Sequence, residues 1–161
     1  MRRKDREITE REDILDIMRR CDVCRLALND DGYPYVVPLN FGLIANGDEI
    51  ELIFHGALEG HKLDLIRADN RASFEMDCNH KLQYFEERGY CTYAYESVIG
   101  RGHVVFVAEE EKASMLQVLM DHYHPARHAG FNPAAIPRTA VFKLKVESIN
   151  GKRKELKREE K

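Results

Sequence analysis

The chain has 161 residues and a mass of 18.7 kDa, with 43% hydrophobic residues and a formal net charge of -3 at pH 7. No apolar run approaches the roughly 18 to 20 residues of a membrane span, the charged opening lacks the apolar core of a secretory signal, and the net charge gives no reason to expect general nucleic-acid affinity. We therefore expect one cytoplasmic domain with its own core, no membrane or nucleic-acid partner, and four cysteines that are reduced thiols.

The first predicted element is a helix from about residue 10 to residue 20. Apolar residues between positions 14 and 21 recur near helical spacing, and Thr9 followed by Glu12 matches a capping box. A short strand over 23–28 follows, and the Asn29-Asp30-Asp31-Gly32 turn leads out of it.

A hairpin is predicted next. Residues 33–42 are rich in β-branched and aromatic side chains, Asn46-Gly47 tolerates positive φ, and residues 49–54 alternate as a half-buried strand does. We expect the strand over 33–42 to pair with the strand over 49–54.

The loop after this hairpin is a candidate anion site. It contains Gly56 and Gly60 and opens a short helix over 60–68, with Lys62 in the first turn. Free N–H groups and the positive end of a helix dipole favour a phosphate. A solvated surface lysine is the alternative, and the spacing is not that of a P-loop.

The second half of the chain predicts more strands. We expect a strand over 71–77, a loop or insertion over 78–89, a long extended run over 90–107 and a final strand over 139–149. Gly100 and Gly102 inside the long run indicate a bulge, a bend or the close approach of a ligand. An amphipathic helix over 109–123 and a loop over 124–137 separate the last two strands.

These elements favour an antiparallel β-barrel with peripheral helices, in one domain whose ends, 1–8 and 152–161, are frayed. A doubly wound parallel sheet is disfavoured because the connections between the first strands are too short for parallel crossovers.

Cysteine and histidine clusters have competing interpretations. Cys21-x-x-Cys24 invites a zinc or redox site, but without a second such pair we favour buried or half-buried free thiols and predict no metal. His122, His124 and His128 favour an exposed loop over a metal site. His55 either ends a strand bonded to backbone or contacts a bound anion.

The order of segments resembles a known family. The stretches PYVVPLNFG (34–42) and FHGALEGHK (54–62), then Ser97-Val98-Ile99-Gly100-x-Gly102, and a last strand ending in Gly151-Lys152 are similar to the pyridoxamine 5'-phosphate oxidase-related flavoproteins. Within that group the chain most resembles the nitroimidazole-resistance branch. The likeness runs from about residue 3 to residue 154.

The resemblance implies a mainly β flavin-type split barrel that forms a homodimer, with FMN at each of two sites across the subunit interface. It places one strand along the isoalloxazine edge, a turn at the ribityl chain and phosphate with Lys62 as the cation, and a further strand close to the cofactor. The residues so implied are Val37, Pro38, Leu39, Asn40, Phe41, His55, Gly56, Ala57, Lys62, Ser97, Ile99, Gly100 and, as a second phosphate cation, Lys152.

The implied activity is reduction of a small organic acceptor, because the redox chemistry belongs to the flavin. No catalytic side chain is predicted, although the 122–128 loop could close over the flavin. The ending GKRKELKREEK does not match the arginine-rich signature of members that oxidise pyridoxamine phosphate, which argues against vitamin B6 oxidation. The alternative function is a non-catalytic module that stores or senses FMN, haem or another planar ligand.

Overall fold

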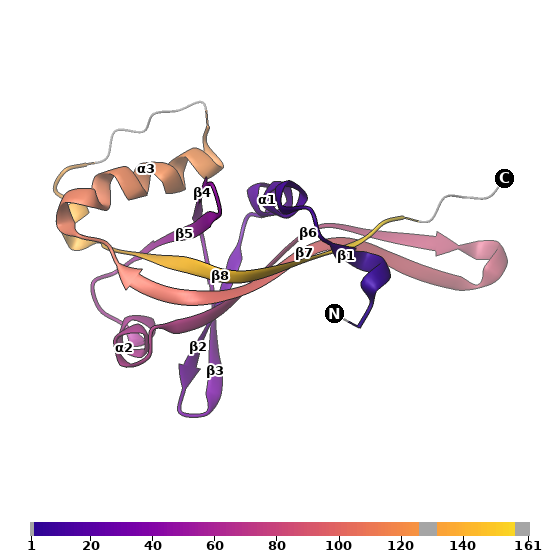
Figure 1. Ribbon diagram of the computed structural model, residues 1–161, viewed down its shortest axis with the longest axis horizontal. Coiled ribbons are helices and arrows are strands. Elements are labelled where there is room, and N and C mark those ends of the chain that lie inside the picture. The colour runs from indigo at the N-terminus through magenta and orange to yellow at the C-terminus, as the bar shows by residue number, and fades with distance from the viewer. Residues whose placement is uncertain (1, 126–131, 157–161) are drawn as a thin grey trace.

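The computed structural model of the chain describes residues 2–125 and 132–156, which form an eight-stranded antiparallel sheet with helices around it (Figure 1). The strands are β1 (Glu7–Ile8), β2 (Cys24–Asp30), β3 (Tyr33–Leu39), β4 (Gly42–Asn46), β5 (Glu49–Gly56), β6 (Arg71–Phe85), β7 (Tyr90–Phe106) and β8 (Ala140–Lys154). The α-helices are α1 (Arg11–Arg20), α2 (His61–Ala68) and α3 (Lys112–Tyr123), and short 3-10 turns lie at Lys4–Arg6, Glu86–Arg88, Glu109–Glu111 and Ile136–Arg138.

The sheet is curled but not closed. Its hydrogen-bonded order is β3-β2-β6-β7-β8-β5-β4, with β1 paired to β8. The two ends of this order, β3 and β4, are joined through only Asn40 and Phe41. Because two residues cannot span a flat sheet of this width, the sheet must wrap around its core. The predicted antiparallel split-barrel fold with peripheral helices is confirmed.

The core fills the inside of this curl. Phe41, Phe54, Phe74 and Phe142 are fully buried there, and the apolar side of α1 closes one end. A smaller cluster lies on the opposite side of β5 and β8, where α3 packs. Gly42 permits that packing, because a Cβ atom there would lie 2.7 Å from the backbone nitrogen of Leu119 in α3.

The three predicted helices are confirmed, with one error in capping. Helix α1 begins at Arg11, its N-cap is Glu10, and no side chain caps it, so the predicted Thr9–Glu12 capping box does not form. Helix α2 and helix α3 lie within the predicted ranges. None of the helices in the described ranges is long and apolar enough to cross a membrane.

The predicted central hairpin is wrong in its pairing. Strand β3 pairs with β2, with Pro38 opposite Arg25, while β5 pairs with the separate strand β4. The extended run predicted over 33–42 is therefore interrupted at Asn40 and Phe41, because Phe41 turns into the core.

Two segments predicted to be irregular are strands. Residues 78–85 continue β6, with a register shift between Cys78 and Lys81, and pair with the first part of β7. Lys152, expected in a frayed end, lies in β8 opposite both Ser97 and Glu7. These pairings extend β6, β7 and β8 well beyond the core.

Candidate functional site

The predicted phosphate end of the site is assembled where β5 leads into α2. Gly60 is the N-cap residue with φ of +135°, and its carbonyl accepts a hydrogen bond of 2.8 Å from the N–H of Leu63. The N–H groups of His61 and Lys62, in the same turn, have no acceptor within the helix. They can therefore donate to an anion at this loop.

Lys62 folds back from this first turn over Gly56 at the end of β5. Its Nζ atom is 3.0 Å from the position that a Cβ atom on residue 56 would occupy, so a side chain at Gly56 would displace the ammonium group. The pKa of His55, next to Gly56, is lowered by burial and then by the charge of Lys62. The structure thus brings His55, Gly56 and Lys62 together, as the sequence predicted.

The second part of the site is the outer edge of β3. Among the described strands, β3 pairs only with β2, so one edge of its backbone faces away from the sheet. Pro34 and Pro38 have no N–H to donate, which an edge strand tolerates. Val37 and Leu39 pack against the core, and Pro38 and Asn40 are exposed. The backbone edge and these two exposed residues can contact a planar ring.

His61 joins these two parts. Its Nε2 atom lies 2.7 Å from Oδ2 of Asp30 in β2, and its ring packs edge-on against the ring of Tyr35 in β3, with 5.0 Å between centroids. The first residue of α2 therefore lies against the β2–β3 hairpin. The turn after β5 and the β3 edge are neighbours, although these two strands do not pair.

Phe41 is placed differently from the other residues of its predicted strand. Its side chain is fully buried, its ring lies 4.4 Å from that of His122, and its backbone N–H donates a 3.0 Å hydrogen bond to the hydroxyl of Tyr123. Neither its side chain nor its N–H faces the β3 edge. Its role is to fix α3 against the core.

The third part of the predicted site lies on β7 and β8. Ser97 is opposite Lys152, and Ile99 is exposed on the outer face of the sheet. Gly100 faces the core, where a Cβ atom would collide with the ring of Phe74 and lie 2.8 Å from the carbonyl oxygen of Ser148. Core packing explains this glycine without a ligand. The register shift at Gly102 confirms a bulge in the long strand.

Within a single chain, this third part of the predicted site lies far from the first two parts. Pro38 and Ile99 lie on one rung, joined through Arg25 and Glu75, so they are three strand spacings or about 14 Å apart. His55 is opposite position 141 of β8 and Ile99 is opposite position 150, a separation of roughly 30 Å along the strand. A single small ligand held at Lys62 and His55 does not reach Ile99 of the same chain.

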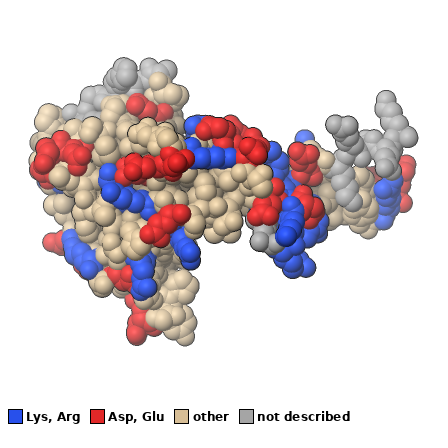
Figure 2. Space-filling model, viewed as in Figure 1, with Lys and Arg blue, Asp and Glu red and all other residues tan. Residues whose placement is uncertain are grey.

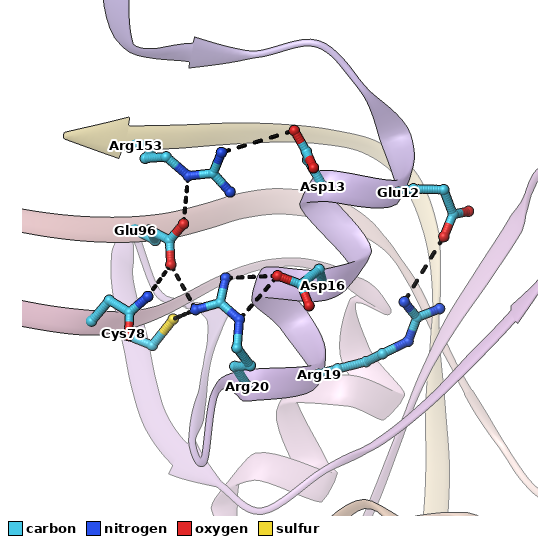
Figure 3. A network of polar contacts seen from close by, with 9 residues as sticks. Glu12, Asp13, Asp16, Arg19, Arg20, Cys78, Glu96 and Arg153 are labelled. Carbon is cyan, nitrogen blue, oxygen red and sulfur yellow. Dashed lines mark hydrogen bonds and ion pairs between the residues drawn. The ribbon is translucent and has the colours of Figure 1, made fainter. Parts of the chain in front are cut away.

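A buried ionic network next to Ser97 was missed from the sequence. The carboxylate of Glu96 accepts hydrogen bonds from Arg20 of α1 (2.6 Å) and from Arg153 of β8 (2.5 Å), as Figure 3 shows. It also accepts a hydrogen bond from Asn79 of β6. Burial opposes ionisation of Glu96, but these bonds outweigh it, so the pKa of the carboxyl group is lowered. The sequence does contain a signal for this burial. Side chains alternate between the two faces of β7, and Glu96 falls on the face whose neighbouring residues are buried.

Of the remaining cysteine and histidine predictions, some agree with the structure and one is wrong. Cys21 and Cys24 are free and buried, as favoured, and burial raises the pKa of Cys24 to about 12. His122 is not in an exposed loop, because it lies in α3 with Nε2 2.9 Å from the carbonyl oxygen of Cys21. His124 is exposed, and His128 lies outside the described residues.

The curled open sheet, with a cation and a helix start beside a free strand edge, defines the split-barrel class of proteins. The chain belongs to the pyridoxamine 5'-phosphate oxidase family, whose sequence profile matches residues 10–153. None of the curated proteins matches the chain.

Solved structures agree with this assignment. A proposed 5-nitroimidazole antibiotic resistance protein from Bacteroides thetaiotaomicron is 31% identical, with a TM-score of 0.77 over 91% of this chain and 85% of that one. The FAD and haem binding protein from Mycobacterium smegmatis is 23% identical, with a TM-score of 0.78 over 93% and 74%. The flavocytochrome Anf3 from Azotobacter vinelandii is 20% identical, with a TM-score of 0.75 over 99% and 75%. The last two similarities establish the fold alone.

Proposed function

We propose that the protein is an FMN-binding oxidoreductase that works as a homodimer in the cytoplasm and reduces a small organic acceptor. The observation that carries this proposal is the position of Lys62, whose ammonium group lies over Gly56 beside the open first turn of α2. A cation and several N–H donors at one point suit a phosphate monoester. Family membership and the flavin-binding proteins among the structural neighbours support a flavin there.

The fit of FMN extends to the rest of the site. Ala57 and the amides of His61 and Lys62 would surround the phosphate, and His55, whose pKa is lowered, would present a neutral ring to the ribityl hydroxyls. The β3 edge from Val37 to Asn40 would line the ring. When bound, the flavin supplies the transfer of a hydride or electrons to the acceptor.

The distance between the parts of the site supports the proposed homodimer. Ser97, Ile99 and Lys152 are predicted cofactor contacts, yet in one chain they lie about 14 Å from the β3 edge and roughly 30 Å from His55 along the strands. A second copy can supply these residues to a cofactor held by the first. The exposure of Ile99, an apolar residue in mid-strand, is consistent with this role.

The absorbance spectrum of the purified protein tests the proposal. We expect flavin bands, and mass spectrometry of the molecule released on denaturation should give FMN rather than FAD. A colourless protein that takes up no added FMN would overturn the proposal.

A second candidate function is a non-catalytic module that stores or senses a planar ligand. It is favoured by the haem binding named for one neighbour of the same fold. Turnover with a reduced nicotinamide and a panel of nitroimidazole and quinone acceptors separates the two candidates. Tight FMN binding without turnover on any acceptor would favour the module.

A further inference from the structure

Two cysteines from distant parts of the chain meet where α1 ends. Cys21 is the C-cap residue of α1, and its side chain is buried in the core. Cys78 lies in β6, is half-buried, and packs against the same core cluster. Because α1 and β6 are separated in the sequence by four strands and a helix, only the fold brings these two residues together.

The strand pairing turns the side chain of Cys78 toward α1. Cys78 is opposite Glu96 in β7, so the two side chains lie on the same face of the sheet. Arg20, the last residue of α1, donates from Nη1 to Glu96 (2.6 Å) and to the sulfur of Cys78 (3.5 Å), as Figure 3 shows. Cys21 follows Arg20 directly, so the contact that holds the end of α1 over β6 also places Cys21 there.

The two thiols interact with each other. The pKa of Cys21 is raised first by burial and then by the charge of Cys78 and a side-chain hydrogen bond to it. The raised pKa of Cys24 has another origin, namely burial and the charge of Glu75. Cys91 is exposed near the start of β7. The structure therefore pairs Cys21 with Cys78.

The backbone next to Cys78 is irregular. Asn79 has φ of +56°, and the register of β6 against β7 shifts between Cys78 and Lys81. A bulge of this kind interrupts the ladder and changes the direction of the side chains beside it. A movement of the Cys78 sulfur toward Cys21 therefore takes place at the end of a regular stretch of the ladder and not within it.

We propose that Cys21 and Cys78 form a reversible disulfide bond, which a low-molecular-weight disulfide such as oxidised glutathione closes and a thiol reopens. The thiolate of Cys78, the more exposed of the two, attacks the oxidant, so that one glutathione leaves as a thiol and Cys78 carries a mixed disulfide. The sulfur of Cys21, after loss of its proton, then displaces the second glutathione. The protein loses two electrons and two protons, and the oxidant becomes two thiols.

Proximity favours this bond, whereas neither thiol is activated. Burial raises the pKa of Cys78 more than its hydrogen bond to Cys21 and the charge of Arg20 lower it, so the attacking thiolate is scarce and the first step is slow. The second step is intramolecular, and groups held side by side have a high effective concentration. Closure is therefore governed by the redox poise of the surroundings and not by fast scavenging of an oxidant.

The surface above the pair suits a hydrophilic oxidant. Figure 2 shows acidic and basic side chains next to one another over α1. Asp16 and Arg20, which form an ion pair of 2.9 Å, belong to this surface. Glutathione carries both carboxylate and ammonium groups, and it can approach Cys78 along this charged side of the molecule.

The test is oxidation of the purified protein in buffers of oxidised and reduced glutathione, followed by alkylation of free thiols and mass spectrometry of tryptic peptides. Trypsin places the cysteines in separate peptides, 21–25 (CDVCR), 72–81 (ASFEMDCNHK) and 89–101. We expect the first two peptides to be joined by a disulfide bond, while Cys91 is found alkylated or as a mixed disulfide with glutathione. Dithiothreitol should release the joined peptides.

Cys24→Ala is the matched control, because Cys24 lies in the same tryptic peptide as Cys21. The cross-link should persist in this variant and should be absent in Cys78→Ser. Fragmentation of the joined wild-type peptides identifies the bonded cysteine without any variant. The bond closes a long loop, so oxidation should raise the melting temperature of the wild type by at least about 5 °C and leave that of Cys78→Ser unchanged.

The proposal does not rest on the flavin, and these measurements need no FMN. A bond from Cys78 to Cys24 would overturn it, because the geometry selects Cys21. Mixed disulfides without a cross-link at every ratio of oxidised to reduced glutathione would overturn it as well, since they would show that the two sulfur atoms do not reach each other.

Discussion

Replacement of Lys62 by alanine is the sharpest test of the phosphate site. Lys62 is half-buried, and its Nζ atom lies over Gly56, 3.0 Å from the place of the missing Cβ atom. A fully exposed ion pair contributes about 0 to 1 kcal/mol, whereas a hydrogen bond to a charged group contributes about 1.5 to 3 kcal/mol. The pKa of the neighbouring His55 is lowered first by burial and then by the charge of Lys62. The partial burial of Lys62 itself favours the larger range.

The expected result is a weakening of FMN binding by about 10- to 150-fold in Lys62→Ala. Quenching of flavin fluorescence measures the dissociation constant of the apoprotein. Riboflavin, which lacks the phosphate, should bind the variant and the wild type equally well. Lys145→Ala is a control because it removes an exposed cation from β8 and should leave both affinities unchanged.

A loss of the same size for FMN and riboflavin would refute the reasoning. It would mean that Lys62 acts through the ring or through the shape of the site, and that the start of α2 does not hold a phosphate. Unchanged affinity for FMN would refute it as well.

Three further substitutions test other contacts. Gly56→Ala should weaken FMN binding by up to about tenfold without loss of stability, because its methyl group displaces only the flexible end of Lys62. Glu96→Gln should lower the free energy of unfolding by about 1.5 to 3 kcal/mol in chemical denaturation at pH 7, since it removes charge-assisted bonds inside a buried network. Gly100→Ala should lower it by about 1 to 3 kcal/mol, because the added Cβ atom meets the ring of Phe74.

The pH dependence of stability gives an independent measure of the Glu96 network. Its pKa is lowered in the folded protein, so its contribution is present above the unfolded value of about 4.3 and is lost as the pH falls through the folded value. Between pH 6 and pH 3.5 the wild type should therefore lose more stability than Glu96→Gln. If the free energy of unfolding fell equally with pH in the two proteins, the carboxyl group of Glu96 would not be responsible for the loss of stability.

The sequence predicted those parts of the fold that local signals determine. The helical spacing before Cys21, the loop into α2 and the acidic start of the helix that ends at Tyr123 are local, and all three helices were found near their observed ranges. The last part of β6, residues 78–85, was missed because alternation indicates a strand most clearly when one face is buried. Here both faces are largely exposed, so the sequence has the polar, aromatic character of a loop, whereas its partner residues 90–94 lie in the extended run that was predicted.

Strand pairing could not be derived from the same signals. The stretch 33–42 and the stretch 49–54 are consecutive extended segments with a turn between them, which is typical of a hairpin. What separates them is the burial of one side chain, Phe41, under α3, where its partner Tyr123 lies 82 residues later in the sequence. A contact of that range leaves no trace in the local pattern.

The observed pairing of β5 with β4 leaves one edge of β3 free, which favours the proposed function. If β3 paired with β5, the hydrogen-bonding edge from Val37 to Leu39 would be occupied by another strand and could not meet a ligand. Because Phe41 diverts the chain, β5 takes β4 as its partner and β3 stays at the margin of the sheet, while His61 still holds the start of α2 against Tyr35. The free edge of β3 beside the proposed phosphate site therefore depends on the interruption at Asn40 and Phe41, which local sequence signals did not predict. Phe41→Ala should therefore weaken both the packing of α3 and the binding of FMN, measured by chemical denaturation and by quenching of flavin fluorescence.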